Sequence, residues 1–295
     1  MDNKAQIEQI NLADRAIRVI SEDGFFRAVA VKNSLTAKTS QISHDYKSIE
    51  LVKAHAQVMA AASLLSAFLK GEERMIIDIT SDGKIEKLYA EAMPIGETRG
   101  FARINEAFNG KYFNTLMRVT RILYGENEPI TGIVEIHRDS IQENIEEYLT
   151  MSEQIPSMVL LDSCVDADGI IEQSGGLIVQ AMPGASSADI EQVRNSLSKA
   201  KPITEYLKAG MRPDQLLKEI LPFNFQTVKS TRIDFFCRCN KDQFTSKLMT
   251  LGLDEIKAMK NDGHNELVCQ FCNKHYILDD TDFDKIIIEL QAKHN

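Results

Sequence analysis

The chain has 295 residues, of which 43 % are hydrophobic, so it can form one large domain and a small one and is not disordered as a whole. Its net charge of −9, from 34 basic and 43 acidic residues, argues against a general nucleic-acid-binding protein, which normally presents a basic face. The most apolar stretch, residues 54–69, contains histidine, glutamine and serine and is too short to span a bilayer. The first residues are polar, so we expect no export signal, no membrane partner and a reducing cytoplasmic compartment.

Residues 1–183 are predicted to form one α+β domain with a mainly antiparallel sheet. The turn-forming triplets Glu22-Asp23-Gly24 and Ser81-Asp82-Gly83 separate apolar runs and predict two hairpins. Strands that come in hairpins, with helices between them, favour α+β over a doubly wound parallel sheet. The predicted elements are strands over residues 16–21 and 25–32, a helix over 36–69, strands over 74–80, 85–92 and 132–137, a helix over 140–154, and strands over 158–166 and 177–182.

This first domain has no catalytic signature. Gly96-Glu97-Thr98-Arg99-Gly100 lacks the glycine spacing and the Lys-Ser/Thr of a phosphate-binding loop. Gly175-Gly176 is interpreted as a turn or bulge, and Cys164, alone in an apolar strand, as a small buried hydrophobic residue. No nucleophile, base and orienting group can be assembled, so we expect that the protein is not an enzyme and has neither catalytic nor organic-cofactor residues.

Residues 184–230 are predicted to be a helical linker of low stability. A helix capped by Ser186 or Ser187 should run to Leu197, and a second should begin near Pro213 and end before Pro222. Their apolar positions form a thin stripe, and such helices must pack on a neighbour to stay folded. The segment is therefore either a plain connector or a metastable region that can unfold. The stripe comprises Ile190, Val193, Leu197, Ile203, Leu207, Leu216, Leu217, Ile220 and Leu221.

Four of the five cysteines lie in two close pairs, Cys237-Arg238-Cys239 and Cys269-Gln270-Phe271-Cys272. Two such pairs, brought together by the intervening segment, supply the four thiolates of a tetrahedral zinc site, although iron–sulfur clusters use the same ligands. Arg238, Lys241 and Lys274 are near in sequence, and positive charge lowers the pKa of a thiol. A disulfide across Cys-x-Cys would be small and strained, hence labile. A purely structural zinc site is the simpler interpretation.

Residues 231–295 are predicted to form this metal-binding domain. Short helices are expected over residues 241–251 and 254–260, then a hairpin of residues 266–270 and 275–278, and a final helix capped by Thr281 or Asp280. Large apolar side chains are few, so the domain should depend on its metal for folding. Loss of the metal should unfold it and remove support from a linker that packs on it.

The sequence around the cysteines resembles the redox-regulated heat-shock holdase family of bacteria, whose members have a mass of thirty-three kilodaltons. The likeness covers nearly the whole chain, and Cys-x-Cys followed by Cys-x-x-Cys in this setting is unusual. One departure is Asn240, where the family is expected to have serine; Cys164 is an additional thiol. Neither removes a ligand. The matching segments are residues 233–239 (IDFFCRC), 251–256 (LGLDEI), Asp262-Gly263, 266–273 (ELVCQFCN), 175–185 (GGLIVQAMPGA) and 96–102.

The resemblance implies a cytoplasmic chaperone that is inactive while reduced and bound to one Zn²⁺ per chain through Cys237, Cys239, Cys269 and Cys272. Oxidation would release zinc and form the disulfides Cys237–Cys239 and Cys269–Cys272. The zinc domain and linker would then unfold, and the protein would bind unfolding client proteins without ATP. Homodimer formation on oxidation and transfer of clients to ATP-dependent refolding chaperones are further family expectations.

Two other functions are compatible with parts of the sequence. The first is a constitutive zinc-ribbon protein that binds RNA or a protein partner and never releases its zinc; acidic charge and the lack of interleaved basic and aromatic residues argue against RNA. The second is a thiol–disulfide exchange enzyme, which would need Cys-x-x-Cys at a helix start in a thioredoxin-like context that is missing here. The client-binding surface and any role of Cys164 cannot be predicted from the sequence.

Overall fold

A computed structural model describes residues 13–110, 115–125, 128–136 and 140–293. The chain divides after Phe236 into two compact units. The first unit contains two β-sheets, the helices between them and the helical segment 184–230; the second contains four of the cysteines. Within the described ranges, no helix combines the length and apolar character needed to cross a membrane.

The two sheets of the first unit are almost entirely antiparallel. Among the strands that the structure describes, the single exception is β11, which pairs with β5 in parallel. This arrangement confirms the predicted α+β class. The five-stranded sheet has the order β10 (Phe225–Arg232), β1 (Arg15–Ser21), β2 (Phe26–Lys32), β9 (Ile171–Ala181), β8 (Ser157–Val165). The six-stranded sheet has the order β11 (Asp234–Phe235), β5 (Glu97–Ile104), β4 (Ile85–Ala92), β3 (Arg74–Ser81), β6 (Thr115–Ile122), β7 (Ile130–Ile136).

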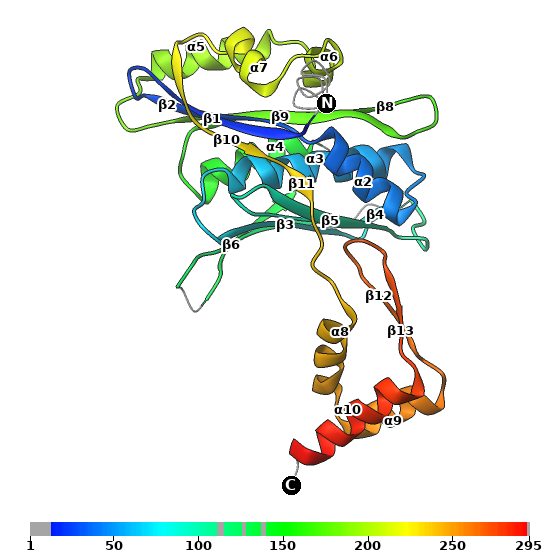
Figure 1. Ribbon diagram of the computed structural model, residues 1–295. Helices are drawn as coiled ribbons and strands as arrows, with labels where there is room; N and C mark the ends of the chain where they lie inside the picture. The colour runs from blue at the N-terminus through cyan, green and yellow to red at the C-terminus, as the bar shows by residue number, and fades with distance from the viewer. Residues whose placement is uncertain (1–12, 111–114, 126–127, 137–139, 294–295) are drawn as a thin grey trace, which may run out of the picture. The chain divides into compact units, whose positions relative to one another are not determined.

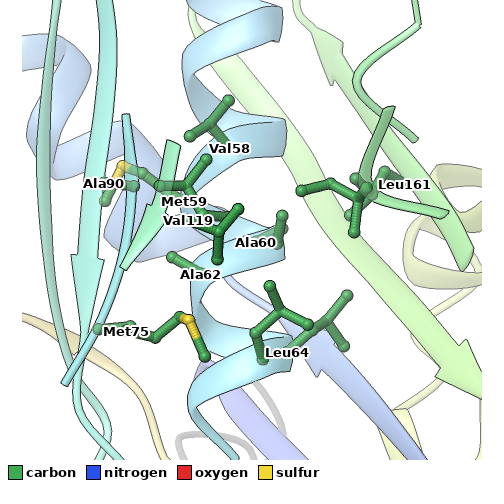
Figure 2. Packing of buried hydrophobic residues seen from close by; sticks show 14 of the residues in the cluster. Val58, Met59, Ala60, Ala62, Leu64, Met75, Ala90, Val119 and Leu161 are labelled. Carbon is green, nitrogen blue, oxygen red and sulfur yellow. The ribbon is translucent and has the colours of Figure 1, made fainter. Parts of the chain in front are cut away.

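Helix α3 (Ile49–Ser66) is the centre of the first unit, between the two sheets (Figure 1). Every residue from Val58 to Ser66 is buried, because the helix contacts both sheets and has no solvent-facing side there. Figure 2 shows Met59 directed toward Ala90 of β4, with Leu161 of β8 on the other side of the helix. Helices α2 (Ser34–His44) and α4 (Ile141–Met151) pack beside α3 in the same layer.

The single helix predicted over residues 36–69 is wrong, because the chain breaks into α2 and α3. Asp45 has a left-handed backbone (φ +54°) that ends α2, and its N–H bonds back to the carbonyls of Gln41 and Ile42. Ser48 then accepts a hydrogen bond from Leu51 N–H and begins α3. Strands β5 and β6 were not predicted from the sequence.

Two other local predictions are corrected. Gly175 and Gly176 lie inside β9, where a Cβ atom would stand 2.4 Å from the carbonyl oxygen of Val31 and 2.7 Å from that of Leu160. Glycine is needed there for close strand approach and not for a turn. Cys164 is only half-buried on β8, with its sulfur 3.9 Å from a carboxylate oxygen of Glu172, so it is not an apolar core residue.

The helical segment covers the face of the five-stranded sheet opposite to α3 (Figure 1). It holds three helices, not two: α5 (Ser187–Ser198), α6 (Ile203–Lys208) and α7 (Pro213–Ile220), followed by β10. The predicted apolar stripe packs on this sheet, with Leu216 and Leu217 fully buried, so its support within the first unit comes from β1, β2, β8 and β9. The proposed boundaries at 183/184 and 230/231 stay predictions.

Gly96 holds the last strand of the first unit in place. Its backbone has φ +97°, and a Cβ atom there would lie 1.8 Å from the carbonyl oxygen of Arg232. The Gly96 carbonyl accepts a hydrogen bond from Asp234 N–H (3.0 Å), and Thr98 accepts one from Phe236 N–H (3.1 Å). Close contact of this kind with a neighbouring backbone is possible only for glycine.

Replacing Gly96 by alanine should therefore separate β11 from β5. We expect a loss of at least about 1–3 kcal/mol in the free energy of unfolding, from the backbone strain alone, and faster hydrogen exchange at the Asp234 and Phe236 amides. The matched control is Gly24→Ala, which shares a positive φ (+77°) but has no atom within 4 Å of the new Cβ. Equal exchange rates in both variants would show that the Arg232 contact is unimportant.

The second unit is small and built mainly of helices. Its apolar core consists of Ile256, Leu278, Phe283, Ile286 and Leu290. The final helix is capped by neither predicted residue: Asp279 accepts the hydrogen bond from Asp282 N–H (3.0 Å). The elements are α8 (Lys241–Leu248), a 3₁₀ turn (Met249–Leu251), α9 (Leu253–Asn261), β12 (Glu266–Val268), β13 (His275–Ile277) and α10 (Asp280–Lys293).

Candidate metal centre

The four cysteine sulfurs of the second unit meet in one cluster. Their Sγ atoms all lie within 4.8 Å of one another, with Cys237 3.6 Å from Cys269 and Cys239 3.4 Å from Cys272. No disulfide joins any two of these four residues. Four sulfurs at about 2.3 Å from a tetrahedral ion are about 3.8 Å apart, so the cluster needs little adjustment to hold a metal.

Local backbone geometry explains how the pairs are presented. Cys269 and Cys272 lie in the turn that joins β12 to β13, which closes when Asn273 N–H bonds to the Cys269 carbonyl (2.8 Å) and Cys269 N–H to Lys274 (3.0 Å). Asn273 adopts a left-handed conformation (φ +55°) that reverses the chain. The other pair precedes α8, whose first turn is capped by Asn240 Oδ1 accepting from Gln243 N–H (2.8 Å). Asparagine is thus a competent cap here in place of serine.

The sulfurs are largely shielded from water, and this opposes their ionisation. Cys269 is 3 % exposed and the other three are half-buried. Burial raises the pKa of Cys237 and of Cys272. Burial also disfavours the Cys239 thiolate, but hydrogen bonds from Tyr276 and the neighbouring thiols outweigh it and lower the pKa of Cys239. Four close thiolates need a cation among them, and an all-sulfur donor set suits zinc or an iron–sulfur cluster.

A family model described as Hsp33 protein matches residues 14–279 of this chain. The chain belongs to the Hsp33 family. It is 28 % identical over 295 residues to the 33 kDa chaperonin of Citrifermentans bemidjiense, covering 95 % of this chain and 98 % of that protein. It is 30 % identical over 293 residues to the 33 kDa chaperonin of Bacillus pumilus, covering 94 % and 99 %. The resemblance seen in the sequence is confirmed.

The fold agrees with a solved structure that carries the same description. The crystal structure of the 33 kDa chaperonin (HSP33) from Thermotoga maritima superposes with a TM-score of 0.84, at 21 % identity, over 95 % of this chain and 99 % of that one. Hsp33 is a chaperone family and is non-enzymatic, in agreement with the expectation that this chain is not an enzyme. In this Hsp33 chain the chaperone fold is combined with the four-cysteine cluster described above.

Basic residues near the cluster do not all act as the sequence indicated. Lys241 forms an ion pair with Asp282 of α10. The negative charge of Asp282 offsets the effect that the Lys241 charge would have on the pKa of the thiols. Lys274 Nζ lies 5.2 Å from the centroid of the Tyr276 ring, as a cation–π contact. The activation of the thiols by these two lysines is therefore weaker than sequence proximity suggested.

Tyr276 contacts the cluster and was not predicted from the sequence. Its hydroxyl donates a hydrogen bond to the Cys239 carbonyl (2.9 Å) and lies 3.2 Å from the Cys239 sulfur. Groups that contact metal ligands in this way fix their orientation and tune their charge. Its place in the sequence, four residues after Cys272, could have indicated that it lies near the cluster. In the structure its side chain is buried on β13.

Tyr276→Phe should weaken metal binding while leaving the unit folded. Loss of one hydrogen bond to a ligand residue typically costs about 10–100-fold in affinity, and we expect an effect in this range. Competition between the reduced protein and a chromogenic chelator measures it. Tyr124→Phe, at a tyrosine 81 % exposed in the first unit, is the control. Identical zinc affinities in the two variants would show that the Tyr276 hydroxyl is not part of the site.

Proposed function

We propose that this Hsp33-family chain is a redox-regulated, ATP-independent holdase. The observation that carries the proposal is the cluster itself: four cysteine sulfurs within 4.8 Å of one another, in a unit with few other large buried side chains. A unit of this kind owes much of its folding free energy to a bound metal, so chemistry at the sulfurs controls whether it is folded.

The resident metal is proposed to be one Zn²⁺ per chain, held by Cys237, Cys239, Cys269 and Cys272. An all-thiolate, closed, tetrahedral arrangement is typical of structural zinc. Bound zinc would hold all four sulfurs as thiolates, against the burial that otherwise keeps Cys237 and Cys272 protonated. The protein is proposed to be inactive in this state.

Oxidation is proposed to form the disulfides Cys237–Cys239 and Cys269–Cys272. For each, two thiolates, one hydrogen peroxide and two protons from solvent would give one disulfide and two waters, and a bound metal would lose two ligands. The choice of disulfide partners matters, because the shortest sulfur–sulfur distances join one Cys pair to the other. They are Cys237 to Cys269 and Cys239 to Cys272, and a disulfide across either is called crossed below. Crossed disulfides would close long loops and stabilise the folded unit, whereas disulfides within each pair constrain almost nothing. The second pairing is therefore the one that favours unfolding.

The unfolded state is proposed to bind unfolding client proteins. The helices α5–α7 hold their apolar side chains against the five-stranded sheet, and their release would expose both surfaces. Dimer formation on oxidation, transfer of clients to ATP-dependent refolding chaperones and a cytoplasmic location complete the proposal. We place the functional boundaries at residues 1–183, 184–230 and 231–295.

The deciding experiment follows zinc and chaperone activity together. The purified reduced protein is treated with peroxide under gentle heating, while zinc release and suppression of the aggregation of a test protein are recorded. About one zinc per chain should leave as activity appears, and reduction in the presence of zinc should reverse both. Mass spectrometry of non-reduced peptides should show the two within-pair disulfides. Retained zinc without activity would indicate a constitutive structural zinc protein instead.

A further inference from the structure

A small cavity lies in the first unit, far in sequence from the four clustered cysteines. It has a volume of about 210 Å³ and opens between β2 and β9 on one side and β3 and β6 on the other, beside the ends of α3 and α4. Its lining is partly polar and partly apolar, and the apolar part is contributed by Leu65, Phe68, Leu69, Met75, Leu149 and Ile155. A cavity of about 150 Å³ is enough to hold benzene, so this one fits a molecule of about eight non-hydrogen atoms.

The polar part of the wall carries an excess of positive charge. Arg27 and Arg121 both line the cavity, against one carboxylate, Glu153. Glu153 is already engaged: its Oε1 accepts from Arg121 Nη2 (2.9 Å) and from the Tyr148 hydroxyl (2.6 Å). Arg121 Nε is buried and has no hydrogen-bond partner within the described parts of the chain. A buried N–H of this kind is costly unless something accepts from it.

Arg27 is the cation that lacks a counter-ion. Its Nε donates to the Gln180 side chain (2.9 Å), and its guanidinium lies 4.3 Å from the Phe68 ring centroid, but among the described residues it has no ion-pair partner. Burial, and then the neighbouring Arg18 cation, lower the pKa of Arg27 even though Glu153 acts in the opposite direction. The surroundings of Arg27 therefore favour an added negative charge.

We propose that this cavity binds a small monocarboxylate with a short apolar tail, whose carboxylate pairs with Arg27 and whose tail packs against Leu65, Phe68 and Leu149. A planar guanidinium such as that of Arg27 can bind a carboxylate through two parallel hydrogen bonds. A lysine ammonium lacks this two-pronged geometry. The site does not involve the cysteines, so it is independent of the redox function proposed above.

The test uses the reduced, full-length protein with ¹³C-labelled methionine and isoleucine methyl groups. Hexanoate is titrated, and the Met75 and Ile155 signals report on the cavity, while Ile256 in the second unit reports on non-specific effects. We expect saturable shifts of the first two signals only. Hexylammonium, 1-hexanol and acetate, which alter the charge or remove the tail, should each bind at least about tenfold more weakly.

A matched pair of variants tests the role of Arg27. Arg27→Met should weaken hexanoate binding by about tenfold or more, and Arg27→Lys should restore part of it. The control is Arg103→Met, which also removes a guanidinium stacked on an aromatic ring, that of Phe101 at 5.3 Å, but lies outside the cavity. The proposal is overturned if hexanoate gives no saturable shifts, if hexanol or acetate binds equally well, or if Arg27→Met binds hexanoate like the unmodified protein.

Discussion

Replacing Cys269 by serine is expected to weaken metal binding strongly and to unfold the second unit even under reducing conditions. Cys269 is the most buried of the four ligands, at 3 % exposure, and it anchors the turn between β12 and β13. Loss of a ligand should lower zinc affinity by more than about 100-fold, since loss of a hydrogen bond to a ligand alone costs about 10–100-fold. The apolar core that remains is too small to compensate.

Circular dichroism and limited proteolysis measure this effect. The Cys269→Ser variant should lose the helical signal of α8–α10, and protease should degrade residues 237–295 while sparing the first unit. The control is Cys164→Ser, which removes a free thiol from β8, outside the cluster, and should keep both zinc and protease resistance. A protease-resistant second unit in Cys269→Ser would refute metal-dependent folding.

Leu217→Ala is expected to release the helical segment from its sheet and to produce holdase activity without oxidant. Leu217 in α7 is fully buried against the five-stranded sheet. A buried leucine truncated to alanine typically costs about 2–5 kcal/mol, which is large for helices as short as α6 and α7. Detachment of these helices should therefore be populated at physiological temperature, while the four-cysteine cluster stays intact.

Hydrogen exchange and a chaperone assay under reducing conditions test this expectation together. Amides of residues 203–220 should exchange much faster in Leu217→Ala, and aggregation of a test protein should be suppressed without zinc release. Val228→Ala is the control, because Val228 lies in the same segment but is 50 % exposed on β10. Fast exchange without any chaperone activity would mean that release of these helices does not create the client-binding state.

Sequence reasoning succeeded where a local pattern carries the information. The cysteine spacing predicted the cluster, and turn triplets predicted the hairpins β1–β2 and β3–β4, because these features need only nearby residues. The break at Asp45 was missed because the helix was predicted from the spacing of apolar residues, and that spacing does not reveal a residue with a left-handed backbone. Strand β5 was missed because it contains a glycine, Gly100, which is not typical of a strand. Glycine is needed there because a Cβ atom would lie 2.5 Å from the Tyr89 carbonyl oxygen on β4, a contact that exists only in the folded protein. Tyr276 was missed because its contact with Cys239 also exists only in the folded protein.

The path of the chain across Ile233 has a further consequence. Here β10, the outermost strand of one sheet, continues directly into β11, the outermost strand of the other, and Ile233 N–H bonds to the Asp14 carbonyl between them (3.0 Å). Residues 225–235 thus protect two sheet edges at once. If this segment detached, β1 and β5 would each present a row of unpaired N–H and C=O groups. An extended polypeptide could add to either edge through its main chain, whatever its side chains.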